Sequence, residues 1–150
     1  MNVPLAYHLT WTTYGTWLPG DPRSWVKKGD PVVQAPNPER EEVARSRMVA
    51  DPVILDKSQQ TLVEDTVRKH CHIRGWVLHV VRALTNHVHV VVSANLDPET
   101  IRDQLKAWCS RQLSEQAGRR RTWWTEKGWA KWIENEEYLE NAIRYVLEGQ

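Results

Sequence analysis

Residues 85–93, with the sequence TNHVHVVVS, constrain the fold more than any other stretch of this 150-residue chain. Successive side chains of a β-strand point to opposite faces, so His87 and His89 share one face and three alternating valines share the other. The stretch predicts a strand that buries its valines beneath helices and presents two imidazoles on its other side. A His-x-His pair alone fits a metal site and an ordinary pair of sheet residues equally well.

The segments before this strand predict a helix followed by a β-hairpin. Residues 76–84 alternate as a second strand, and a Thr-Asn pair supplies the tight connection between the two strands. We expect the helix over about residues 58–73, with Ser58 as its N-cap and Gly75 as its end.

The two ends of the chain complete the pattern. Residues 7–14 are β-branched and aromatic and predict the first strand, and residues 130–133 predict the last. A helix is expected from Asp97, which is followed by a proline, to Gly118. Asn135 is the expected N-cap of a final helix. The apolar stripe of that helix consists of Leu139, Ala142, Ile143 and Val146.

This order of elements predicts one α+β domain over residues 1–150. It is the ferredoxin-like βαββαβ order: an antiparallel sheet with helices on one face, followed by an additional C-terminal helix. We expect the histidine face of the sheet to be left open. Prolines recur through residues 20–57, which predicts a long loop insertion, either functional or a flexible surface excursion, with a short helix possible over residues 39–48.

Composition narrows the class of protein. The net charge of +1 excludes a globally basic nucleic-acid binder, so any phosphate-binding surface must be local. Cys71 and Cys109 lie in different predicted helices and are expected to be reduced thiols, and His70-Cys71-His72 is not expected to bind zinc. No stretch has the length and apolarity of a membrane span, and no secretory signal is visible, so a cytoplasmic protein is expected.

Taken together, the predicted fold, the His-x-His strand and the tyrosine-bearing last helix resemble the HUH endonucleases. The likeness is greatest to the single-tyrosine transposases of small insertion sequences and to REP-associated tyrosine transposases. It includes residues 7–20 (YHLTWTTYGTWLPG) and residues 132–146, which contain Tyr145. It covers nearly the whole chain outside the insertion.

The resemblance implies a transposase that cuts and rejoins single-stranded DNA bearing hairpins. By position, His87 and His89 would hold a divalent metal ion, Mg²⁺ or Mn²⁺, and Tyr145 would form a 5′-phosphotyrosine. Tyr138, seven residues earlier, is the rival nucleophile. The family's third metal ligand often lies four residues after the tyrosine, which here is Gly149, so Glu148 or Gln150 must replace it, with Gln150 favoured if Gly149 ends the helix in a left-handed turn.

Phosphate contacts are expected from arginines, and the nine tryptophans could supply stacking platforms for unpaired bases. The resemblance allows both monomers and homodimers that exchange tyrosine helices. Two other functions are compatible with the sequence: a relative that binds hairpin nucleic acid without cleaving it, and a metal enzyme acting on small molecules. The arginines in question are Arg119, Arg120, Arg121, Arg82 and Arg144.

Overall fold

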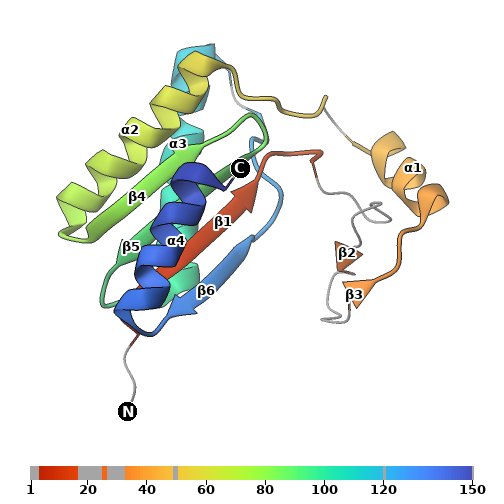
Figure 1. Ribbon diagram of the computed structural model, residues 1–150. Coiled ribbons are helices and arrows are strands. Elements are labelled where there is room, and N and C mark those ends of the chain that lie inside the picture. Colours follow the sequence, from red (N-terminus) through yellow and green to blue (C-terminus); the bar gives the residue numbers. More distant parts are fainter. Residues whose placement is uncertain (1–3, 17–24, 27–32, 49–50, 120, 150) are drawn as a thin grey trace.

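The computed structural model describes residues 4–16, 25–26, 33–48, 51–119 and 121–149. Its centre is a four-stranded antiparallel sheet in the order β4-β5-β1-β6 (Figure 1). Counted along the chain these are the second, third, first and fourth strands of the predicted plan, so the ferredoxin-like arrangement is confirmed. The strands are β1 (Ala6–Thr12), β4 (Val77–Ala83), β5 (His87–Ser93) and β6 (Trp129–Ile133).

Two helices, α2 (Lys57–Arg74) and α3 (Pro98–Ala117), cover one face of this sheet (Figure 1). The main core lies between them and the sheet and is built on the predicted valine face of β5 together with Leu9 and Trp11 of β1, both fully buried. Cys71 and Cys109 are buried free thiols in this layer, as expected. Among the described helices, none combines the length and apolarity that a membrane span requires.

Local capping chemistry sets the helix boundaries. Asp97 caps α3, and Gly118 ends it in the left-handed conformation with φ of 69°, both as predicted. The predicted cap of α2 is wrong by two residues. Asp56, not Ser58, accepts from the backbone N–H of Gln59, and the Gln59 side chain accepts from the Asp56 N–H, which completes a capping box.

The prediction that the histidine face stays open is wrong at one end. Helix α4 (Glu136–Glu148) packs there through its predicted stripe, with the fully buried Val146 in a second core that also contains Val91 of β5. Arg82 of β4 adds two hydrogen bonds to this contact. Its Nη1 donates to the carbonyl oxygens of Val146 and Leu147, each at 3.0 Å. These are carbonyls of the last turn, which lack partners within the helix.

The described part of the insertion contains one helix and two short strands. It contains a nine-residue helix, α1 (Pro38–Ser46), capped by Asn37, and two unpredicted two-residue strands, β2 (Trp25–Val26) and β3 (Val33–Gln34), that pair with each other. The predicted alternative of a flexible surface excursion is wrong for the last residues of the insertion. Val53 and Leu55 are buried in the main core, where their backbone N–H groups donate to Tyr14 and Thr85, respectively.

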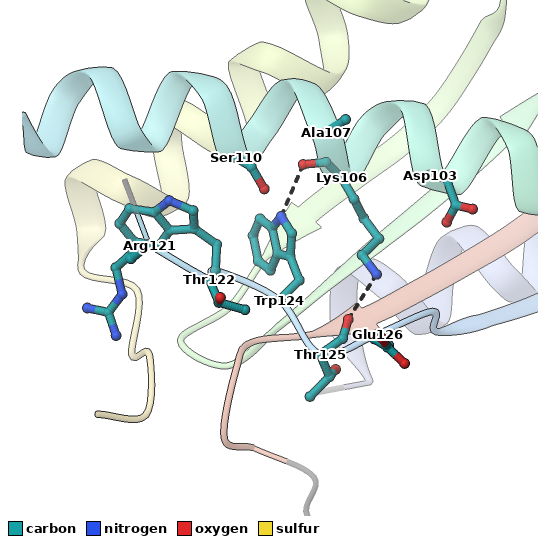
Figure 2. A pocket seen from close by; sticks show the side chains of 10 residues that line it. Asp103, Lys106, Ala107, Ser110, Arg121, Thr122, Trp124, Thr125 and Glu126 are labelled. Carbon is teal, nitrogen blue, oxygen red and sulfur yellow. Dashed lines mark hydrogen bonds between the residues drawn. The ribbon is translucent and has the colours of Figure 1, made fainter. Parts of the chain in front are cut away.

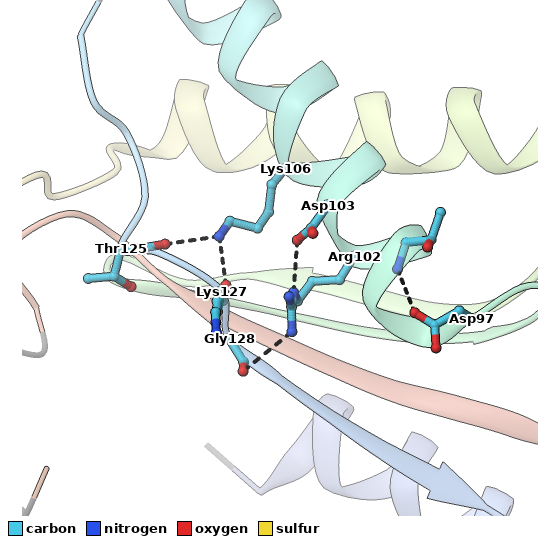
Figure 3. Close-up of polar contacts among 8 residues, drawn as sticks. Asp97, Arg102, Asp103, Lys106, Thr125, Lys127 and Gly128 are labelled. Atoms are coloured by element: carbon cyan, nitrogen blue, oxygen red, sulfur yellow. Dashed lines mark hydrogen bonds and ion pairs between the residues drawn. The ribbon is translucent and has the colours of Figure 1, made fainter. Parts of the chain in front are cut away.

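Polar contacts join α3 to the segment that leads into β6. The indole Nε1 of Trp124 donates to the carbonyl oxygen of Lys106 at 3.1 Å (Figure 2). The Lys106 ammonium in turn donates to the carbonyl oxygens of Thr125 and Lys127, at 2.9 and 2.6 Å (Figure 3). Burial, reinforced by the charge of Arg102, lowers the pKa of Lys106 to about 8. These contacts fix the path of the chain before the edge strand β6 begins.

Gly128 is required where this segment meets β1. Its φ is +141°, and a Cβ there would lie 2.5 Å from the carbonyl oxygen of Thr10. We therefore expect Gly128→Ala to lower the free energy of unfolding by about 2–4 kcal/mol, through backbone strain and this collision. Urea denaturation measures the loss. Gly118→Ala is the control, since its Cβ would meet open space, and a loss of about 1 kcal/mol is expected.

Arg82→Met should weaken the attachment of α4 while keeping the aliphatic part of the side chain. Losing two hydrogen bonds from a charged donor should cost about 1–2 kcal/mol of stability. Amide hydrogen exchange should accelerate in the last turns of α4, a local effect that urea denaturation alone would not reveal. Arg144 is exposed on α4, and the free energy of unfolding of Arg144→Met is expected to stay within about 0.5 kcal/mol of the wild-type value. Equal effects of the two substitutions would contradict the role given to Arg82.

Candidate active site

The two histidines of β5 lie together on the α4 side of the sheet, with ring centroids 4.9 Å apart. A third histidine joins them. His8 of β1 places its Nε2 3.0 Å from Nδ1 of His89, and Thr10 places its hydroxyl 3.2 Å from the same nitrogen. Burial, and then the charge of Lys131, lowers the pKa of His8 and favours its neutral form. The sequence prediction assigned no role to His8.

The hydrogen bonds of these rings bear on which nitrogens could bind a metal ion. Nδ1 of His87 lies 2.7 Å from the side-chain oxygen of Asn86, an acceptor, and in the tautomer that donates to this oxygen Nε2 carries the lone pair. A metal ion on Nε2 of His89 likewise requires a proton on Nδ1, which the neutral His8 can accept through its Nε2. The contacts of His87 and His89 therefore fit a pair of Nε2 metal ligands.

Tyr145 is the tyrosine that meets the histidines. Its ring centroid lies 5.8 Å from that of His89 and 6.1 Å from that of His8, in both cases edge to face. Half of its surface is exposed, which leaves room for a substrate to approach. Tyr138 is also exposed but lies in the first turn of α4, roughly 10 Å away along the helix axis.

Gly149 ends α4 in an unexpected way. Its φ is −85°, so the helix does not end in the left-handed turn on which the preference for Gln150 depended. A Cβ at this position would lie 2.9 Å from Cδ2 of the Tyr145 ring. The absence of a side chain thus makes room for the ring of Tyr145.

The third ligand remains a prediction. Within the described part of the chain, no group of three or more His, Cys, Asp or Glu side chains is placed to hold a metal ion. Glu148 is exposed at the end of α4, three residues after Tyr145. Gln150 lies outside the described residues.

The predicted DNA-binding arginines fall into two groups. Arg144 is exposed beside Tyr145, while Arg82 is engaged with the end of α4, a contact that the sequence prediction missed. The predicted cluster lies between α3 and β6, at the end of the sheet that carries His87; Arg120 lies outside the described residues. There Arg119 is exposed, and Arg121 donates to the carbonyl oxygen of Asp51 and lies 5.4 Å from the Trp123 ring centroid.

A separate cavity of about 370 Å³ opens between α3 and residues 121–126 (Figure 2). Its walls carry charges of both signs, from Lys106 and Arg121 and from Asp103 and Glu126. The Lys106 amine is already hydrogen-bonded to two carbonyl oxygens. The cavity therefore lies where α3 packs against the segment before β6. None of the three histidines lines it.

Comparison with known proteins places this geometry in a known fold. Neither a protein-family model nor a curated protein matches the sequence. A solved structure from Deinococcus radiodurans R1, assigned as a transposase, superposes with a TM-score of 0.53 at 14% identity, over 100% of this chain and 93% of its own. A REP-associated tyrosine transposase bound to a REP hairpin gives a TM-score of 0.55 at 12% identity, over 97% of this chain and 67% of its own. The chain thus has the fold of the tyrosine transposases.

Proposed function

We propose that this protein is a transposase that cuts and rejoins single-stranded DNA, with Tyr145 as its nucleophile. The observation that carries the proposal is the position of the Tyr145 ring, 5.8 Å from that of His89, in a fold shared with a tyrosine transposase. Hairpin-bearing DNA is the proposed substrate because that transposase was solved with a hairpin.

The proposed reaction is a transesterification. The phenol oxygen of Tyr145 bonds to the phosphorus, the bond from phosphorus to the 3′-oxygen breaks, and the phenol proton ends on the released 3′-hydroxyl. The product is a 5′-phosphotyrosine, which a 3′-hydroxyl can later attack to rejoin a strand without an external energy source. A phenol with a pKa near ~10 is a weak nucleophile at neutral pH, so the surrounding site must stabilise the transition state.

A divalent cation, Mg²⁺ or Mn²⁺, would supply that stabilisation by withdrawing charge from the phosphate. His87 and His89 would hold it through Nε2, with an oxygen donor from Glu148 or Gln150 or from water. His8 acts as a positioning residue in this proposal, because it fixes the orientation of the His89 ring through Nδ1. It does not itself touch the substrate.

The proposed DNA contacts follow from the positions of the arginines. Arg144 is exposed next to Tyr145 and can approach a phosphate near the cleavage point. The cluster of Arg119, Arg120 and Arg121 would contact phosphates of the hairpin. Since Tyr145 approaches the histidines of its own chain, one chain suffices to assemble tyrosine and histidines, and a homodimer is not required for this contact.

Covalent capture of DNA tests the proposed function. Incubating the protein with hairpin-bearing single-stranded DNA and Mg²⁺ or Mn²⁺ should yield a protein–DNA adduct that survives denaturing electrophoresis. Tyr145→Phe should lower the adduct by at least about 1,000-fold, because it removes the attacking oxygen. Tyr138→Phe, the matched control on the same helix, should form the adduct normally.

Other outcomes of this experiment point elsewhere. An adduct lost in Tyr138→Phe and retained in Tyr145→Phe would contradict the assignment of the nucleophile. Tight hairpin binding with no adduct in the wild type would indicate a DNA-binding relative that does not cleave. If the protein neither bound nor cleaved such DNA, a metal enzyme acting on small molecules would become the better hypothesis.

Metal binding without DNA tests the role of the histidines. His8→Ala should weaken Mn²⁺ binding by about 10- to 100-fold, the usual effect of removing a residue that orients a metal ligand. Electron paramagnetic resonance titration of free Mn²⁺ measures this directly. His79→Ala is the control, because the ring of His79 is hydrogen-bonded to Ser93 instead. Unchanged affinity in His8→Ala, together with loss in His89→Ala, would contradict the positioning role.

A further inference from the structure

Edge strand β6 presents two exposed side chains, Trp129 and Lys131, beside the candidate active site. Trp129 is the register partner of Thr10, which is itself the partner of His89. Directly opposed residues of neighbouring strands share a face of the sheet. Trp129, Thr10 and His89 therefore form a row on the histidine face, in which Trp129 lies two strand spacings, roughly 10 Å, from His89.

Lys131 occupies the same face one step along β6. Its register partner is His8, which places Lys131 beside the site on the histidine face. Lys131 is exposed, and 50% of the Trp129 surface is exposed. Helix α4 packs mainly on β4 and β5 (Figure 1), and the core that it shares with β6 contains Ile133, at the end of that strand.

A second exposed tryptophan of β6 shows that this placement is specific to one face. Trp132 is 55% exposed, but it is the partner of Tyr7 and lies on the opposite side of the sheet. Its ring packs edge to face against Tyr7, with centroids 6.4 Å apart. Of these two exposed tryptophans of one strand, only Trp129 faces the histidines.

We propose that Trp129 and Lys131 form a subsite for the unpaired nucleotide that adjoins the phosphate attacked by Tyr145. In this subsite the Trp129 ring stacks on the base and the Lys131 ammonium contacts the nucleotide's phosphate. The inference rests on the proposed function and identifies part of its substrate site. A single strand fits because it offers an unstacked base and a phosphate together, whereas a duplex hides the faces of its bases.

Binding of single-stranded DNA in metal-free buffer tests the subsite. The probe is a labelled DNA hairpin with a short oligothymidine tail, suitable because stacking tolerates any base, and fluorescence anisotropy gives the Kd. Trp129→Ala should weaken binding by about 10-fold or more. Trp129→Phe should retain most of the affinity, and Trp132→Ala, the control on the opposite face, should stay within about 2-fold of the wild type. Lys131→Gln should also lower the slope of log Kd against log salt by about 0.7, the amount for one phosphate contact.

An abasic scan locates the stacked base. Replacing the tail nucleotides one at a time should reveal one position at which loss of the base weakens wild-type binding and does not weaken Trp129→Ala binding further. That non-additivity is the signature of a direct contact. Equal losses in Trp129→Ala and Trp132→Ala, or fully additive losses at every tail position, would overturn the proposal.

The adduct assay separates this inference from the proposed function. If the wild type forms the adduct with Tyr145 and Trp129→Ala binds the tail unchanged, the subsite is refuted. The proposed transposase activity is then unaffected. A wild-type protein that shows the abasic signature but forms no adduct refutes strand transfer and supports a stacking site on β6. Absence of any DNA binding in the wild type refutes both.

Discussion

The attachment of α4 to the histidine face is the interaction on which the candidate site depends. Two forces of different character produce it. Burial of an aliphatic side chain such as Val146 contributes about 1.5–3 kcal/mol but is non-directional, so it would tolerate sliding or rotation of the helix. The bonds from Arg82 to the carbonyl oxygens of Val146 and Leu147 are directional and fix the last turn, where Tyr145 lies. Apolar burial thus attaches the helix to the sheet, and the hydrogen bonds of Arg82 attach its last turn.

Much of the fold was predictable because its signals are local. The caps at Asp97 and Asn135, the stop at Gly118 and the alternation of β5 each depend on a few neighbouring residues, and all four are confirmed. The side of the sheet taken by α4 was not predictable in this way. Its apolar stripe shows that the helix is buried on one side, but the stripe carries no information about which face of the sheet receives it. The capping box at Asp56 was present in the sequence and was overlooked in favour of Ser58.

The candidate site was predictable to the same limited extent. The position of Tyr145 in a helix followed from sequence, but its approach to the histidines depends on the packing of α4. His8 carried a signal in the alternation of the first strand, yet its contact with His89 depends on the pairing of β1 with β5, across 81 residues of chain. The bonds of Arg82 to the end of α4 were not predictable either, because an arginine on a strand carries no local signal that it meets a helix end. Long-range register, rather than residue type, is the missing information in each case.

Gly149 constrains which side chains the end of α4 can carry. The resemblance leads to the expectation of a metal-ligand side chain at this position, because the family often carries one there, but any Cβ here would come within 2.9 Å of Cδ2 of Tyr145. A ligand on residue 149 and the present position of the tyrosine ring therefore exclude each other. Any side chain introduced at residue 149 would therefore displace the ring of Tyr145. The position of the Tyr145 ring thus depends on the absence of a side chain four residues further along the chain.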